Sequence, residues 1–188
     1  MQRPDAVVKT SLQSSVEPWL FQVEPYPQES FSHFLGRFRR ANHLSSAHLA
    51  AMLGVRSHVV SYWESPSRQR RPSPPLLQHL AQLTGVSVNR LQGMWLSLAT
   101  ELHWPTRLCP DCYAEAPWHQ LTWQRADQLH CEVHQRWRSR PRGTSLLSQC
   151  PRCHHVFPLP SHWATGQCDR CQLPFAQMRF YQAAADTT

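Results

Sequence analysis

The sequence has no long apolar run and no apolar leader. No segment approaches the roughly 18 consecutive apolar residues that a membrane-spanning helix requires. The first residues, MQRPDAVVKTSLQSSVEP, lack the apolar centre of a secretory signal. The sequence therefore predicts a soluble protein of the cytoplasm.

Lysine is nearly absent, so arginine carries almost all of the positive charge. The chain has 188 residues and a formal net charge of +7, and of its 19 basic residues only Lys9 is a lysine. Guanidinium groups favour paired contacts with phosphates and stacking on bases. Metal binding would lower the charge, because seven cysteine thiolates outweigh two Zn²⁺ ions. The composition indicates a moderate tendency toward phosphate contacts.

Cysteine is missing from the first half of the chain. All seven cysteines lie between residues 109 and 171, and an odd number at paired spacing suits metal better than disulfides. Two sets of four ligands follow one another, namely Cys109, Cys112, Cys131 and His134, then Cys150, Cys153, Cys168 and Cys171. Each set predicts one structural Zn²⁺ with tetrahedral coordination. Pairing between the two sets is the alternative.

An enzymatic interpretation rests on one short motif. His130-Cys131-Glu132 matches the H-x-E of zinc nucleobase deaminases, with a C-x-x-C pair downstream. Gln149 stands where that signature has proline, and four filled positions leave no place for an activated water. We therefore expect no enzyme, and we expect His130, His154 and His155 to be solvated or to lie behind the ligands.

Helical periodicity is confined to the first half. Phe31, Phe34, Leu35 and Phe38 follow the i, i+3, i+4, i+7 rule and predict a helix over 29–41. Capping signals predict four more helices. Ser45 or Ser46 is expected to cap one that ends near Gly54, and Ser57 to cap the next. A further helix is expected after the Ser73-Pro74 cap and ends at Gly85, and Ser87 is expected to cap the last, which carries Leu91, Met94, Trp95 and Leu98. Beyond Trp104-Pro105 the only regular element expected is a short strand at 121–123.

Residues 49–64 resemble the helix-turn-helix of phage repressors. The predicted core positions are Leu49, Met52, Leu53, Val55, Val60 and Trp63, and the predicted outer face of the second helix carries Ser57, His58, Ser61 and Tyr62. That face is poor in the side chains that read base edges. The pattern therefore favours a scaffold or protein-docking element over sequence-specific DNA recognition, which stays open.

Two further segments are candidate contact surfaces. Arg136, Arg138, Arg140 and Arg142 alternate, so an extended backbone would present them on one side as a ladder for phosphates. A solvated loop is the alternative. Near the N-terminus, Trp19 and Phe21 stand in a proline-bounded segment, which we expect to lie over a partner or over its own domain.

The order of these parts resembles the TniQ family of transposition proteins. The most specific matches are the block from Pro25 to Ser45 and the first knuckle from Leu108 to His134, and the likeness runs from about Pro18 to Phe175. The resemblance implies an adaptor that passes a chosen target to the AAA+ ATPase TnsC. Short members are similar to those of bacterial CRISPR-associated transposons, where a guide-RNA-loaded Cas effector finds the target and a host small-subunit ribosomal protein is a further partner.

The sequence thus predicts a mainly α-helical helix-turn-helix domain followed by a zinc-ribbon-like region with little regular structure. The expected boundaries are a flexible lead at 1–17, the helical domain at 18–104, tandem zinc fingers at 105–181 and a flexible tail at 182–188. We expect Trp19, Phe21, His58 and Tyr62 to contact the ATPase, and the arginine ladder to contact RNA or DNA backbone. A DNA-binding transcription regulator is the alternative function.

Overall fold

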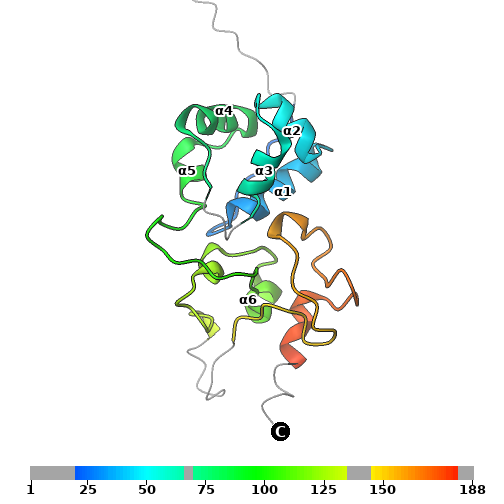
Figure 1. The fold of residues 1–188 in the computed structure, drawn as a ribbon. Coiled ribbons are helices and arrows are strands. Elements are labelled where there is room, and N and C mark those ends of the chain that lie inside the picture. Colours follow the sequence, from blue (N-terminus) through cyan, green and yellow to red (C-terminus); the bar gives the residue numbers. More distant parts are fainter. Residues whose placement is uncertain (1–19, 66–69, 135–144, 182–188) are drawn as a thin grey trace, which may run out of the picture.

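The structure, a computed structural model, describes residues 20–65, 70–134 and 145–181. Five helices lie together at one end of the molecule, and a region of loops and short helical turns lies at the other (Figure 1). We call them the helical half (residues 20–98) and the metal half (residues 101–181). The helices of the helical half are α1 (Phe31–Ala41), α2 (Ser46–Met52), α3 (Ser57–Trp63), α4 (Pro74–Thr84) and α5 (Val88–Gln92).

The beginnings of these helices follow from serine caps. The hydroxyls of Ser30, Ser45 and Ser87 accept hydrogen bonds from the first-turn amides of α1, α2 and α5. Helix α4 has proline in its first turn and ends at Gly85, whose φ of 72° is the left-handed conformation that glycine adopts most easily. The predicted capping signals therefore located α2, α4 and α5, whereas α1 was predicted from its apolar stripe.

Three boundaries differ from the predictions. Helix α1 begins two residues after Glu29, because Ser30 takes the cap position. Helix α3 has Arg56, not Ser57, at its cap and shows no side-chain capping hydrogen bond. Helix α5 ends at Gln92, so Leu98 lies beyond it and is exposed.

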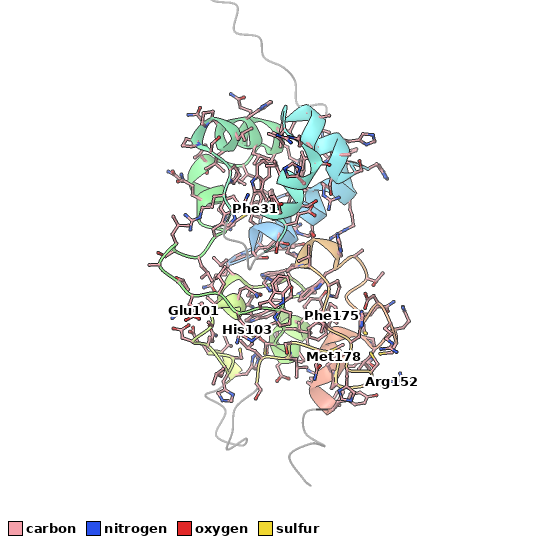
Figure 2. All side chains as sticks on the ribbon, in the orientation of Figure 1. Phe31, Glu101, His103, Arg152, Phe175 and Met178 are labelled. Atoms are coloured by element: carbon pink, nitrogen blue, oxygen red, sulfur yellow. The ribbon has the colours of Figure 1, made fainter. Side chains whose placement is uncertain are left out.

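The core of the helical half confirms the helix-turn-helix. Leu49, Leu53, Val60 and Trp63 are buried, and Met52 and Val55 pack against them. The turn between α2 and α3 places Gly54 at a φ of 67°. The apolar stripe of α1 belongs to this core, and its first residue, Phe31, is labelled in Figure 2 at the end of the helical half that faces the metal half. Burying each such phenylalanine contributes about 1.5–3 kcal/mol.

The metal half contains α6 (Pro110–Glu115) and the 3₁₀ turns η2 (Leu121–Gln124), η4 (Pro160–His162) and η5 (Phe175–Met178). Among its described residues there is no strand, and pairing is limited to isolated bridges such as Leu108 with Leu147. The predicted strand at 121–123 is therefore wrong. The Trp123 amide bonds the carbonyl of Gln120, which coils the segment and buries the Trp123 ring. Helix α6 was not predicted.

Aromatic rings fill the centre of the metal half. Trp163 receives the edges of Tyr113, Phe157 and Phe175 at centroid distances of 4.8–6.4 Å. Phe175 and Met178 are fully buried and are labelled inside this region in Figure 2. The core also takes in the cysteines, so the apolar packing and the metal ligands form one cluster.

Helix α1 joins the two halves. The Ser32 hydroxyl donates to the carbonyl of Glu64 in the helical half and accepts from the amide of Ser161 in η4. Gly36 is packed so closely that an added Cβ would lie 2.2 Å from the Ser161 carbonyl oxygen. The Ser30 hydroxyl bonds Nδ1 of buried His119 at 2.9 Å. The metal half thus packs directly on α1, the helix that contributes Phe31, Phe34, Leu35 and Phe38 to the core of the helical half.

The boundaries predicted for the four parts of the chain stay predictions, and the lead at 1–17 and the tail at 182–188 lie outside the described residues. In the three described ranges, no helix is long and apolar enough to cross a lipid bilayer.

Candidate metal centres

The first cluster brings together the side chains of Cys109, Cys112, Cys131 and His134. Nδ1 of His134 lies 3.7 Å from Sγ of Cys109, 3.2 Å from that of Cys112 and 3.5 Å from that of Cys131. The sulfurs of Cys112 and Cys131 are 3.3 Å apart. Three thiols and one imidazole nitrogen therefore surround one point.

Helix α6 builds half of this cluster. Cys109 is the residue before the helix, and its sulfur accepts a hydrogen bond from the amide of Cys112 at 3.5 Å. Pro110 occupies the first turn, where the missing amide hydrogen costs nothing. The C-P-x-C sequence thus begins a helix, with one thiol at the cap and the other on the first turn.

A carboxylate lies behind the histidine of the first cluster. Nε2 of His134 is 3.1 Å from Oε1 of Glu115 at the end of α6. Metal-binding histidines commonly donate their other ring nitrogen to a carboxylate, which fixes the tautomer and orients the ring. This arrangement leaves Nδ1 of His134 free to bind a metal.

The second cluster is made by Cys150, Cys153, Cys168 and Cys171. The sulfurs of Cys150 and Cys171 are 3.6 Å apart, as are those of Cys153 and Cys168. The cysteines are free thiols, and these separations are far longer than a disulfide bond of about 2.05 Å. All four donor atoms lie within 4.8 Å of one another.

Two hairpins of the same geometry supply these thiols. In each, the amide of the first cysteine bonds the carbonyl five residues ahead, Cys150 to His155 at 2.8 Å and Cys168 to Leu173 at 2.9 Å. The residue after the second cysteine, His154 or Gln172, has a φ near 60°. The second cluster is therefore a pair of matching knuckles, whereas the first combines a helix start with a loop.

Both clusters fit a tetrahedral metal ion. A tetrahedron with bonds of about 2.3 Å has edges of nearly 4 Å, close to the measured separations. Burial raises the pKa of the Cys150 thiol to about 12, so a nearby cation is needed to hold it as a thiolate. Each cluster uses the four residues of one predicted set, and the alternative pairing between sets does not occur.

The other histidines near the clusters do not join them. Nδ1 of His130 is 3.4 Å from the Ser145 hydroxyl, and Nε2 of His155 is 3.5 Å from a carboxylate oxygen of Asp169. The deaminase pattern needs His130 as a ligand, but the first cluster contains Cys131 and His134 instead. The geometry gives that interpretation no support.

The structure places only part of the predicted contact residues. Trp19 and the arginines at 136, 138, 140 and 142 lie outside the described residues. Phe21 has 74% of its surface exposed, while its backbone amide bonds the Asn42 side chain at 2.6 Å. On α3, His58 is exposed and meets the edge of the Tyr62 ring at 5.5 Å.

Sequence reasoning missed a buried ionic network at the start of α1. The side chain of Glu29 is fully buried and binds Nδ1 of His33 at 2.5 Å and two nitrogens of Arg37 at 2.7 and 2.8 Å. Burial by itself would raise the pKa of Glu29, but hydrogen bonds from Arg37 and His33 bring it below the ordinary value. Residues 29, 33 and 37 share one helical face, and this spacing was the available signal.

A second missed group is His119, which contacts both halves. It is fully buried, bonds Ser30, and packs its ring edge-on against Trp123 and Trp163. Burial lowers the pKa of His119 to about 3, so it is neutral at physiological pH. No local pattern around residue 119 indicates this position, because its partners are far away in sequence.

The fold and the two clusters define a helix-turn-helix protein with two candidate metal centres. The sequence model of the TniQ family matches residues 20–155, well over half of the chain. The chain belongs to the TniQ family, whose members serve transposition as adaptors. A search of curated proteins found no match.

Proposed function

We propose that each cluster holds one structural Zn²⁺ ion. The donors are seven thiolates and one imidazole, which zinc favours and which calcium or magnesium does not. In this proposal His134, braced by Glu115, completes the first site. The ions would supply cross-links that fix the loops of the metal half, and no reaction.

We further propose that the protein is a non-enzymatic adaptor that selects transposition targets. It would link a guide-RNA-loaded Cas effector at the target DNA to the ATPase TnsC in the bacterial cytoplasm, with a host small-subunit ribosomal protein in the same assembly. The supporting observation is that both clusters take all four ligands from the protein and that the same chain carries a helix-turn-helix in its other half. Such sites leave no open position for a reactive water.

The proposed ATPase contact combines the N-terminal segment with the outer face of α3. Phe21 is the most exposed of the described large apolar side chains, and exposed aromatic anchors gain binding energy when a partner desolvates them. On α3, Tyr62 and His58 form a second, polar-aromatic surface, where the Arg70 guanidinium lies 4.8 Å from the Tyr62 ring centroid. The proposed RNA contact uses Arg136, Arg138, Arg140 and Arg142.

A binding experiment tests the adaptor proposal. Zinc-loaded protein is presented to the ATPase of the same transposon with ATP and duplex DNA, and capture is compared between the wild type and Trp19→Ala/Phe21→Ala. We expect capture by the wild type and its loss in the variant. Leu98→Ala is the matched control, because Leu98 is also exposed but lies on the connector after α5. No capture by the wild type would contradict the proposal.

RNA binding has its own test. Removing one arginine of the ladder should weaken binding to the guide RNA and lower the dependence on salt, by a slope of about 0.7 per lost contact on single strands. An affinity that does not depend on salt would refute the phosphate ladder.

A transcription regulator is the competing function, because α2 and α3 form the module that such regulators use. Three residues of the outer face are exposed, namely Ser57, His58 and Ser61. None of them has the paired hydrogen-bonding groups with which arginine, asparagine and glutamine recognise base edges. A regulator should prefer one duplex over bulk DNA by at least about 10³-fold. Such a preference without ATPase capture would favour the regulator.

A further inference from the structure

A cleft of about 470 Å³ opens between the two halves. One wall is a polar stripe of α1 formed by His33, Arg37 and Arg40, three and four residues apart. The opposite wall is formed by Tyr113 and the segment 163–166 of the metal half. The cleft is distinct from both cysteine clusters, and its volume is within the range of sites that hold small ligands or peptide side chains.

The arginines of α1 outnumber their acidic partners. Arg37 pairs with Glu29 at 2.7 Å, and Arg39 pairs with Glu64 at 2.5 Å. Arg40 bonds the Ser161 carbonyl at 2.6 Å, and in the described part of the chain no carboxylate lies within ion-pair distance of it. Among the described residues, Arg40 is therefore a cation of the cleft without an ion-pair partner.

Arg40 as a whole is exposed, but neighbouring charges of the same sign act on its guanidinium. Partial burial, followed by the nearby charges of Arg39 and Arg37, lowers the pKa of Arg40. An anionic group that covers Arg40 would offset the repulsion from Arg39 and Arg37 and would strengthen its own attraction to Arg40 by excluding water. An acidic side chain entering the cleft would supply that anionic group.

The other walls of the cleft decide what kind of anion fits. Pro117 and the rim of buried Trp163 give it an apolar side, and the Tyr113 ring stands against Gly166. The Tyr26 ring is covered on both faces, by the Arg37 guanidinium at 4.0 Å and by Trp118 at 4.4 Å. The cleft thus offers apolar contact but no free ring face of Tyr26 on which a base could stack.

We infer that this cleft binds an acidic peptide segment of a partner protein, in which an aspartate or glutamate meets Arg40 and an adjoining apolar side chain rests on Pro117 and Trp163. One unmatched cation suits one carboxylate. A nucleic-acid strand is disfavoured because it needs a track of several cations and exposed ring faces. The inference goes beyond the adaptor proposal and does not depend on it.

The test uses three probes on the full zinc-loaded chain, labelled with ¹⁵N. They are the peptide acetyl-Leu-Asp-Leu-amide, its neutral match acetyl-Leu-Asn-Leu-amide, and a uridine tetranucleotide. We expect the aspartyl peptide to shift the amide signals of Thr165 and Gly166 and the Nε signal of Arg40, saturably, and to bind about tenfold more tightly than the asparaginyl peptide. Equal binding of the two peptides, or a stronger response to the tetranucleotide, would overturn the inference.

Two arginine variants distinguish binding in the cleft from non-specific attraction to the positive charge of the protein. Arg40→Gln should lower the affinity for the aspartyl peptide about tenfold, while Arg56→Gln on the exposed cap of α3 should leave it unchanged. If Arg40→Gln disturbs the docking on Ser161, Arg40→Lys keeps the charge and should retain most of the binding. Loss of binding in Arg56→Gln equal to that in Arg40→Gln would show non-specific attraction and overturn the inference.

The result of the peptide-binding test can be distinguished from the result of the test of the adaptor proposal. Capture of the ATPase by Arg40→Gln at the wild-type level, with peptide binding lost, leaves the adaptor function intact and assigns the cleft to another protein. Loss of capture in Trp19→Ala/Phe21→Ala with peptide binding unchanged shows that the two surfaces act separately.

Discussion

The two halves of this molecule obtain their order from different sources. The helical half buries a periodic apolar stripe, with Phe34, Leu35 and Phe38 of α1 fully enclosed. The metal half has no such periodicity, and its core mixes aromatic rings with cysteines. Burial of apolar side chains is therefore sufficient to order the half whose sequence is periodic. The short irregular loops of the other half need cross-links, here the proposed metal ions.

Metal removal should have the largest effect, because it should unfold the metal half and leave the helical half folded. A strong chelator at neutral pH should remove the fixed tertiary structure of the metal half, because a structural zinc site contributes on the order of 10 kcal/mol to folding. Near-ultraviolet circular dichroism should lose the signal of Trp163 and Trp123, while far-ultraviolet ellipticity keeps most of the helical signal. An unchanged near-ultraviolet spectrum after complete metal loss would contradict a metal-organised half.

The next largest effect is expected at the buried network of α1. Glu29→Gln should lower the free energy of unfolding by about 3–5 kcal/mol, because it leaves Arg37 without its buried partner. The pKa of Glu29 is lowered in the folded state, so its contribution is present above the ordinary carboxyl pKa and is lost as pH falls through the folded-state value. Urea unfolding at pH 7 measures the change.

Asp127→Asn is the control for that substitution. Asp127 pairs with Arg125 on the surface, so its loss should change stability little. Equal effects of the two substitutions would show that the Glu29 network has no special role.

Docking between the halves can be tested at Gly36. Replacing a helical glycine with alanine normally stabilises, but the new Cβ would lie 2.2 Å from the Ser161 carbonyl oxygen. We expect Gly36→Ala to cost about 1–3 kcal/mol through overpacking. Gly93→Ala is the matched control, since its Cβ would meet only backbone atoms at 3.5 and 3.6 Å. Thermal unfolding of the two variants gives the comparison, and a stabilised Gly36→Ala would refute the tight docking.

The smallest effect concerns pH and His119. Its folded-state pKa of about 3 lies below the unfolded value near 6.5, so the unfolded chain takes up a proton first. Above about pH 6.5 the buried neutral His119 carries no protonation penalty. Below that pH its contribution to the free energy of unfolding falls by about 1.4 kcal/mol per pH unit. His119→Gln should therefore cost about 1.4 kcal/mol less at pH 5.5 than at pH 7, measured by urea unfolding. A cost that does not change with pH would contradict a neutral buried His119.

The sequence predicted best what short-range patterns encode. The stripe of α1, the caps at Ser45 and Ser87 and the grouping of cysteines into two sets all depend on neighbours within a few turns. Helix α6 escaped prediction because its stability depends on the Cys109 cap and the cluster beneath it. The turn η2 escaped because the burial of Trp123 is decided by residues distant in the chain.

The same limit explains the missed groups at the junction. His119 bonds Ser30 of the helical half and Gly36 packs against Ser161 of the metal half, and no local spacing reveals such contacts. Glu29 differs, because its spacing to residues 33 and 37 was a local signal. The cleft beside Arg40 belongs to this class, because its walls come from α1 and from residues more than seventy positions later.

In our proposal, two metal ions organise the metal half of this TniQ-family protein. Native mass spectrometry combined with zinc-edge X-ray absorption tests it most directly. We expect two zinc ions per chain, coordinated in total by seven sulfurs and one nitrogen from the clustered residues. One ion or none, or zinc with oxygen ligands from water, would contradict it.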